Sequence, residues 1–282
     1  MNNQKGLSII FLLFVIVFSS SSCDLVGQKT EDAIKPTTEL KSTAAPEIKI
    51  EKHEFSYDGE ERTYWLHIPA GLNVSQPVAA VFALHGINSN PQNMFGAGFK
   101  ETAEQYKFIV IYPALETGEK TGFFRQLLSD LDSIVSIDPK RIYATGFSLG
   151  GQLSYLIACD LSDTFAAIAP VSGMVHCTSY QTDYPVSVIH IHGLADETVP
   201  FEGKNGPPAE EVIAAWVQNN DCPQSPQVEK IDDRVTHLSY APCQDGTAVE
   251  LYTIVAMSHK WPDREMNASE IIWAFFDAHP KP

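Results

Sequence analysis

Ser148 is the residue whose surroundings most clearly predict chemistry. It lies in the segment 146–151, GFSLGG, between a predicted strand at 141–145 and a predicted helix at 148–159. A G-x-S-x-G pattern in that context is typical of a sharp turn that lifts a serine hydroxyl out of a sheet, with glycines where the chain folds back on itself. An ordinary tight turn is the alternative interpretation. The pattern favours a serine nucleophile for acyl transfer.

A serine hydroxyl is a weak nucleophile near neutral pH, so it needs a histidine base that a carboxylate holds in place. After a serine in this kind of turn, the acid and the histidine are expected in that order along the chain. Asp196 follows a predicted strand at 186–190, and His259 follows a predicted strand at 249–255. We therefore expect a triad of Ser148, Asp196 and His259. A turn aspartate and a surface-loop histidine are the alternatives.

Two backbone N–H groups are expected to hold the oxyanion that forms when the serine attacks. Leu149 opens the helix after Ser148, and Ile87 follows the predicted strand 78–84 in Leu84-His85-Gly86-Ile87. His85 is expected to brace this loop, with contact to substrate as the alternative. Trp261 follows the base by two residues, and it could line the substrate pocket or pin the histidine loop.

Two other classes of function compete with the serine hydrolase. His190 and His192, with Asp196, are spaced like some metal ligands, but alternate side chains on a strand are also expected to fill the core. A binding protein on a degenerate hydrolase scaffold is the non-enzymatic alternative. We expect neither a metal nor a cofactor.

The elements that must position these residues alternate along the chain. Extended segments at 48–57 and 63–68 come first, and the apolar run 78–84 reads as a strand buried on both faces. Such alternation predicts an α/β protein with a mostly parallel sheet, helices on both faces, and the first strands as an antiparallel edge. The remaining predicted strands are 108–112, 141–145, 165–171, 186–190 and 249–255, and the predicted helices are 93–106, 122–136, 148–159, 209–219 and 268–278.

Length and charge limit the function further. The 282 residues are 44% hydrophobic, which suits one α/β domain that we expect to span residues 47–282. The formal net charge of −16 would repel a phosphate backbone, so nucleic acid is not an expected partner. The charge does not identify a substrate, and the sequence does not indicate an oligomeric state.

The first 46 residues read as an export segment and a tether. Lys5, the apolar run 7–18 and the serines 19–22 are typical of a signal peptide at 1–22, with a buried helix as the alternative. Cys23 follows directly and resembles the lipidated cysteine of bacterial lipoproteins, although Ser20 stands where leucine is usual; plain secretion is the alternative. Residues 23–46 are polar and aperiodic, which predicts a disordered tether. Export is therefore expected, with membrane contact only through an anchor at Cys23.

Without Cys23, an even set of cysteines remains: Cys159, Cys177, Cys222 and Cys243. In an exported protein such a set predicts disulfides, with buried free thiols as the alternative. Three pairings are possible, of which Cys159–Cys177 and Cys222–Cys243 close the shortest separate loops.

These motifs resemble carbohydrate esterase family 1 and the polyhydroxybutyrate depolymerase-like esterases, over about residues 63–280. The resemblance implies an α/β-hydrolase fold and an extracellular serine esterase that releases feruloyl or acetyl groups from plant polysaccharides, or that cleaves hydroxyalkanoate polyesters. The family also commonly has cysteines at the four positions named above. The matching segments are 84–86, 146–151, 165–171, 192–200, 259–262 and 272–276.

Three departures from the family concern substrate more than chemistry. Ala256-Met257-Ser258 replaces a usual glycine run before the base, and Leu149 stands where asparagine or alanine is frequent. The segment 113–122 is shorter than the family's corresponding loop. A more open cleft is therefore expected, which leaves polyester as an alternative substrate.

Overall fold

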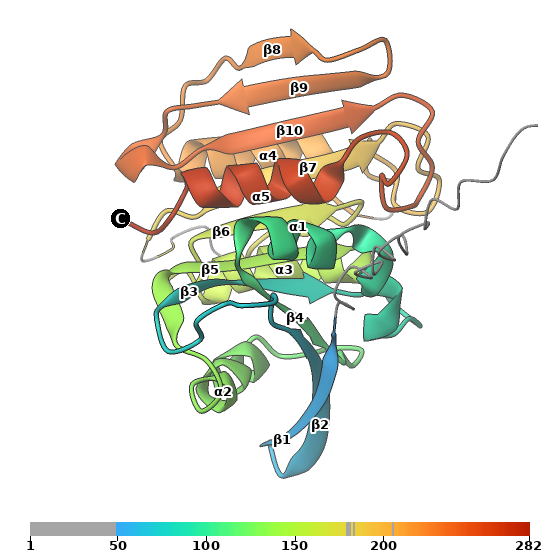
Figure 1. Cartoon of the computed structure of the whole chain (residues 1–282). Helices are drawn as coiled ribbons and strands as arrows, with labels where there is room; N and C mark the ends of the chain where they lie inside the picture. Colours follow the sequence, from blue (N-terminus) through green and yellow to red (C-terminus); the bar gives the residue numbers. More distant parts are fainter. Residues whose placement is uncertain (1–48, 179–181, 183, 205) are drawn as a thin grey trace, which may run out of the picture. The chain divides into compact units, whose positions relative to one another are not determined.

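The computed structural model describes residues 49–282 apart from 179–181, 183 and 205 (Figure 1). The predicted signal peptide, the tether and Cys23 lie outside the described residues. Among the residues that are described, no helix is both long enough and apolar enough to cross a membrane.

The described residues form one ten-stranded sheet in the order β1-β2-β4-β3-β5-β6-β7-β10-β9-β8. The neighbours from β4 to β10 pair in parallel, whereas β1, β2, β9 and β8 pair antiparallel at the two edges. The predicted, mostly parallel sheet is therefore present. The strands are β1 Glu51–Tyr57, β2 Glu60–His67, β3 Val78–Leu84, β4 Ile109–Pro113, β5 Ile137–Phe147, β6 Ala167–Val171, β7 Ser187–Gly193, β8 Gln227–Lys230, β9 Val235–Tyr240 and β10 Val249–Ile254.

Helices cover both faces of the sheet, as expected (Figure 1). On one face, Phe99 of α1 and Trp273 of α5 belong to one apolar cluster with the sheet; on the other, Leu127 of α2, Tyr155 of α3 and Trp216 of α4 belong to a second. The helices are η1 Pro91–Ala97, α1 Phe99–Tyr106, α2 Gly122–Leu131, α3 Leu149–Asp160, α4 Ala209–Asn219, η2 Gln244–Gly246 and α5 Ala268–Ala278, where η marks a 3-10 helix.

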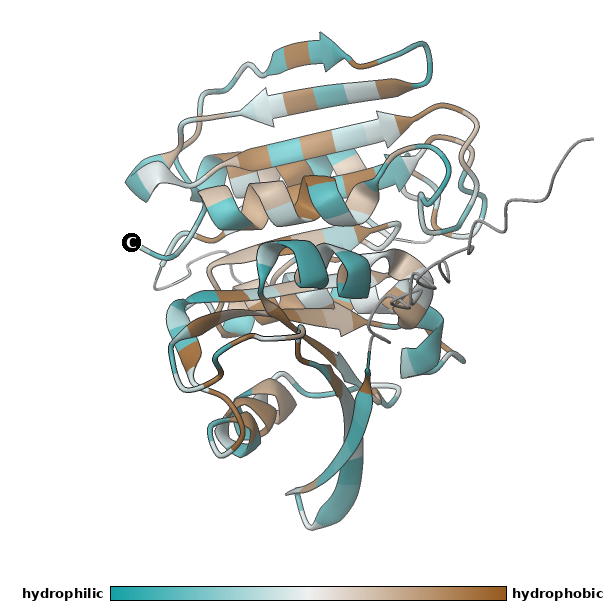
Figure 2. Cartoon of the chain, in the orientation of Figure 1, coloured by the Kyte–Doolittle hydropathy of each residue, from teal (hydrophilic) through white to brown (hydrophobic). Residues whose placement is uncertain are grey.

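The middle of the sheet is the apolar core of the protein. Every residue of β3, VAAVFAL, is buried, as expected for a strand with helices on both faces. Figure 2 shows hydrophobic residues along the central strands and hydrophilic ones on the β1–β2 hairpin. The carboxyl ends of the parallel strands therefore lie on a rigid layer, and in such sheets ligands bind at that edge.

Two sequence predictions about the elements were wrong in part, and one edge of the sheet was not predicted. The helix expected at 93–106 is divided into η1 and α1 by Gly98, whose φ of 90° does not continue a helix. The helix expected at 122–136 ends at Leu131. The second antiparallel edge, β9 and β8, was not predicted, because β8 is a short polar strand, QVEK, exposed at every position.

Candidate active site

The turn between β5 and α3 holds Ser148 in a strained conformation. Its φ and ψ are 57° and −116°, in a region that residues with a Cβ seldom adopt, and its N–H donates to Val171 O at 2.9 Å. The turn also requires glycine: a Cβ on Gly150 would lie 2.2 Å from Leu84 O. The turn thus presses the start of α3 against the end of β3, which places Ser148 at the carboxyl edge of the sheet.

The loops that carry Asp196 and His259 leave two neighbouring parallel strands, β7 and β10. They touch directly, because Met257 O accepts the N–H of Ala195 at 3.1 Å, and a Cβ on Gly193 would lie only 2.1 Å from the same oxygen. A glycine at the end of β7 is therefore what allows the two loops to lie side by side.

The structure brings the three predicted residues within hydrogen-bonding distance of one another. His259 Nε2 lies 2.9 Å from Ser148 Oγ, and His259 Nδ1 lies 2.7 Å from Asp196 Oδ2. An ionised carboxylate only accepts hydrogen bonds, so Nδ1 carries the proton and Nε2 is free to accept the serine proton. The histidine side chain is 17% exposed and the aspartate side chain is fully buried. This arrangement can deprotonate Ser148 during attack on a carbonyl.

Asp196 is held from its other oxygen by its own turn. Its Oδ1 accepts the N–H groups of Thr198 at 3.0 Å and Val199 at 2.8 Å. The carboxylate therefore has both oxygens engaged, one on the backbone and one on the base, which fixes the direction in which the imidazole points.

The expected oxyanion side lies beside the serine. A Cβ on Gly86 would lie 3.5 Å from Ser148 Cβ, so the loop after β3 passes close to the nucleophile. Leu149 is the first residue of α3, where backbone N–H groups are unpaired within the helix. The side chain of Ile87 is 53% exposed. Both expected donor residues therefore belong to segments next to Ser148.

His85 braces this loop. The ring is buried, its Nε2 accepts Leu115 N–H at 3.0 Å, and its Nδ1 lies 2.8 Å from Gly86 O. Burial lowers the pKa of this imidazole, and the neutral ring donates from Nδ1 to Gly86 O. Both of its nitrogens bond to backbone, which agrees with the bracing role, and contact with substrate stays a prediction. Since the Gly86–Ile87 peptide is trans, the same bond directs Ile87 N–H away from the ring.

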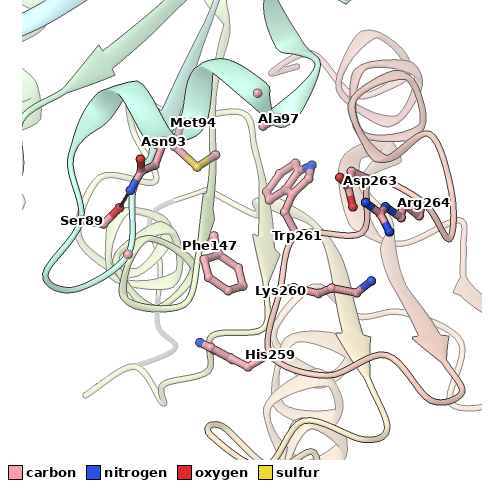
Figure 3. Close-up of a pocket in the computed structure, with 12 residues that line it drawn as sticks. Ser89, Asn93, Met94, Ala97, Phe147, His259, Lys260, Trp261, Asp263 and Arg264 are labelled. Atoms are coloured by element: carbon pink, nitrogen blue, oxygen red, sulfur yellow. Dashed lines mark hydrogen bonds between the residues drawn. The ribbon is translucent and has the colours of Figure 1, made fainter.

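A cavity of about 610 Å³ opens beside the base (Figure 3). Met94 of η1, Phe147 and Trp261 give it apolar walls, and His259 also lines it. Trp261 lines the cavity and also packs edge to face on Phe99 of α1 at 6.0 Å between ring centroids, so the geometry is compatible with either role expected of it. The other lining residues are Gly86, Ser89, Asn93, Gly96, Ala97, Lys260, Asp263 and Arg264.

Sequence reasoning missed the η1 wall of this cavity. Met94 is buried, and Asn93, which also lines the cavity, donates from Nδ2 to Ser89 Oγ at 2.7 Å. Their position in the sequence could have indicated this role, because they follow the loop that carries Ile87, an expected oxyanion donor. The short segment 113–122 is not part of the lining; there Glu119 pairs with Arg62 of β2.

Both expected disulfides, Cys159–Cys177 and Cys222–Cys243, are present. The first joins the end of α3 to the segment after β6, so it ties down the helix that begins beside Ser148. Disulfides are typical of proteins in oxidising compartments, in agreement with export.

Comparison with known proteins agrees with this geometry. Residues 131–190 match the family model of the prolyl oligopeptidase family, a segment that includes Ser148 and stops before Asp196 and His259. Among solved structures, an acetyl xylan esterase from Aspergillus awamori superposes with a TM-score of 0.65 at 15% identity, covering 81% of this chain and 99% of that one. The chain has the α/β-hydrolase fold.

Relatives of this α/β-hydrolase confirm the resemblance inferred from its motifs. It is 30% identical over 182 residues to a probable feruloyl esterase C of Aspergillus niger, and the aligned region covers 60% of this chain and 65% of that protein. It is 24% identical over 245 residues to a poly(3-hydroxyalkanoate) depolymerase C of Paucimonas lemoignei, and the aligned region covers 70% of this chain and 58% of that protein. The chain thus spans less than two thirds of the length of either relative.

Proposed function

We propose that the protein is a serine carboxylic-ester hydrolase. His259 Nε2 accepts the Ser148 proton as Oγ attacks the ester carbonyl, and Asp196 stabilises the imidazolium that forms. The N–H groups of Leu149 and Ile87 stabilise the oxyanion. His259 then protonates the departing alkoxide, and water, activated by the same base, releases the acid from Ser148. The observation that carries this proposal is the hydrogen-bonded sequence Ser148–His259–Asp196 beside an open cavity.

The cavity favours an aromatic acyl group over acetyl. A ligand site of this size with apolar walls and a few polar groups suits a planar ring with a polar substituent. Trp261 and Phe147 offer ring faces and edges to such a group, and Ser89 and Asn93 offer hydrogen-bonding groups for a phenol. We therefore infer a feruloyl-type ester of plant polysaccharide as the substrate, in line with the feruloyl esterase relative.

Removal of the nucleophile tests the chemistry. Ser148→Ala is expected to lose hydrolysis of p-nitrophenyl acetate and labelling by a fluorophosphonate, while circular dichroism shows an unchanged fold. Ser133→Ala is the matched control, because its hydroxyl is exposed and donates only to Asp130 O. Full activity of Ser148→Ala would refute the mechanism, and failure of the wild type to react with the fluorophosphonate would favour the non-catalytic binding protein.

The substrate is tested with esters that differ in one half only. Methyl ferulate and methyl acetate share a leaving group, so a preference for the ferulate reports an acyl site. Methyl acetate and p-nitrophenyl acetate share the acyl group and report a leaving-group site. Faster release of acid from hydroxybutyrate oligomers than from methyl ferulate would favour the polyester alternative, which the depolymerase relative supports.

Export and anchoring remain proposals based on the sequence. We infer that residues 1–22 direct export and that Cys23 is acylated, so that the hydrolase domain is tethered at the cell envelope by 23–46. Mass spectrometry of the protein from its membrane fraction is expected to find a lipid on an N-terminal Cys23, and Cys23→Ser is expected to release the enzyme to the medium. An unmodified peptide that includes Cys23 would indicate plain secretion.

A further inference from the structure

A row of buried aromatic rings leads from α3 to the loop that holds Asp196. Tyr155 Oη lies 2.9 Å from His190 Nδ1, His190 Nε2 lies 3.0 Å from His192 Nδ1, and His192 Nε2 lies 2.8 Å from Val199 O. His190 and His192 have no exposed surface, and their rings are stacked with centroids 5.2 Å apart. None of these four residues lines the cavity beside His259.

The last acceptor decides where every proton in this row lies. A backbone carbonyl only accepts, so His192 carries its proton on Nε2 and donates to Val199 O. The Nδ1 atom of a neutral His192 is then an acceptor, which places the His190 proton on Nε2. His190 Nδ1 in turn accepts from the tyrosine hydroxyl. The hydrogen bonds therefore run in one direction, from Tyr155 to Val199.

The surroundings keep both histidines neutral. Burial lowers the pKa of His190 well below its ordinary value, with the neighbouring His192 acting in the same direction. Burial also lowers the pKa of His192, as does His259, whereas Val199 O, Asp196 and Glu202 oppose the shift. A neutral pair can keep the same pattern of donors while the base gains and loses a proton.

The end of the row lies on the residues that hold the catalytic acid. Val199 O accepts from His192, while Val199 N–H donates to Asp196 Oδ1 at 2.8 Å. His192 Nε2 also lies 3.6 Å from Asp196 Oδ2, the oxygen that accepts from His259. We propose that His192 is a positioning residue, which fixes the turn 196–199 so that Asp196 Oδ2 meets His259 Nδ1. This inference rests on the proposed hydrolase function.

Two amide substitutions separate the two nitrogens of His192. In His192→Gln the amide nitrogen can occupy the place of Nε2 and still donate to Val199 O, whereas in His192→Asn the amide reaches only the place of Nδ1. We expect His192→Asn to lower kcat by about tenfold, the effect of one lost buried hydrogen bond, with KM within about twofold of the wild type. His192→Gln is expected to recover most of kcat. Equal kcat for His192→Asn and the wild type would overturn the proposal.

A destabilised control separates positioning from general loss of stability. Phe124→Leu removes buried volume in the apolar cluster on the α2 face, and its ring contacts Phe82 and Phe165 rather than the site. It is expected to lower Tm while leaving kcat unchanged. The proton NMR signal of the His259 Nδ1 proton is expected to shift in His192→Asn and to stay in place in Phe124→Leu. An unshifted signal in His192→Asn would contradict a positioning role.

The wild type alone provides a test that does not depend on folding of a variant. Nitrogen-15 NMR of histidine rings distinguishes the two neutral tautomers, and we expect His190 and His192 to be protonated on Nε2 and His259 on Nδ1. Protonation of His192 on Nδ1 would overturn the inference, because Val199 O would lose its donor. A wild type without esterase activity would instead refute the proposed function, so the two failures are distinguishable.

Discussion

Gly193→Ala is expected to separate the catalytic acid from the base without changing either residue. A Cβ at this position would lie 2.1 Å from Met257 O and 2.7 Å from Met257 C, both backbone atoms that cannot rotate away. Because Cβ atoms essentially never come within 3.0 Å of such atoms, the end of β7 and the loop after β10 must move apart by roughly 1 Å. Asp196 lies three residues beyond Gly193, and His259 lies two residues beyond Met257. Each catalytic residue therefore moves with the segment that carries it.

The magnitude follows from the geometry of the triad. A displacement of roughly 1 Å lengthens the His259–Asp196 hydrogen bond, now 2.7 Å, beyond the normal range. Misplacement of that size costs about 100-fold in rate, or about 2.7 kcal/mol of transition-state stabilisation. His259, Lys260 and Trp261 line the cavity and belong to the loop that moves, so KM for methyl ferulate is expected to rise as well.

The assay is steady-state hydrolysis of methyl ferulate, with the concentration of reactive sites fixed by fluorophosphonate titration and the fold checked by near-ultraviolet circular dichroism. Gly122→Ala is the matched control, because it begins α2 and its Cβ would meet only Tyr57 Oη at 3.5 Å. This control is expected to keep full activity and to gain about 0.5 to 1 kcal/mol of stability. A kcat for Gly193→Ala within about threefold of the wild type would refute the reasoning.

Three further predictions concern the pocket, pH and the disulfides. Trp261→Ala is expected to raise KM for methyl ferulate by about fivefold to tenfold, the effect of one lost aromatic contact. The KM for methyl acetate is expected to stay unchanged. An effect on p-nitrophenyl acetate alone would instead assign the cavity to the leaving group. Below about pH 6.5 the unfolded chain protonates His190 and the folded protein does not, so the unfolding free energy falls by about 1 kcal/mol between pH 6.5 and 5.5 from this residue. In urea titrations of His190→Gln, this part of the pH dependence of the unfolding free energy is expected to be absent. Replacing Cys222 and Cys243 by serine is expected to lower the unfolding free energy by about 3 kcal/mol, measured in the same titrations, because the closed loop spans a sequence separation of 21.

The catalytic geometry could be predicted from the sequence because each of its residues follows an apolar strand. Asp196 follows β7, which is buried along its whole length, whereas Ser148 and His259 follow β5 and β10, which each have a buried apolar stretch. Such stretches are visible without any structure. Parallel strands bring their carboxyl ends to one edge, so residues far apart in the sequence were expected to meet there. Ser148 and His259 lie 111 residues apart and share a hydrogen bond.

The rest depended on packing that leaves little trace in the sequence. β8 has no buried residue and hence no hydrophobic pattern. Met94 reaches the cavity because Gly98 turns the chain between η1 and α1. In the sequence, a methionine at this position is equally typical of a core residue. His190 and His192 are buried, as expected of side chains that fill the core, but the sequence did not indicate that their ring nitrogens bond to each other, to Tyr155 and to Val199 O. Those partners come from elements that only the fold brings together.

The walls of the cavity and the source of the catalytic acid belong to different parts of the chain. Gly86, residues 89–97 and the loop 259–264 form most of the lining, whereas the turn 196–199 contributes nothing to it. Substrate preference can therefore diverge by exchange of the segment 89–97, a surface stretch without a catalytic residue, while proton transfer stays intact. For protein engineering, this segment is the natural target of a focused library, because variation there is expected to change which ester is accepted while the triad stays intact.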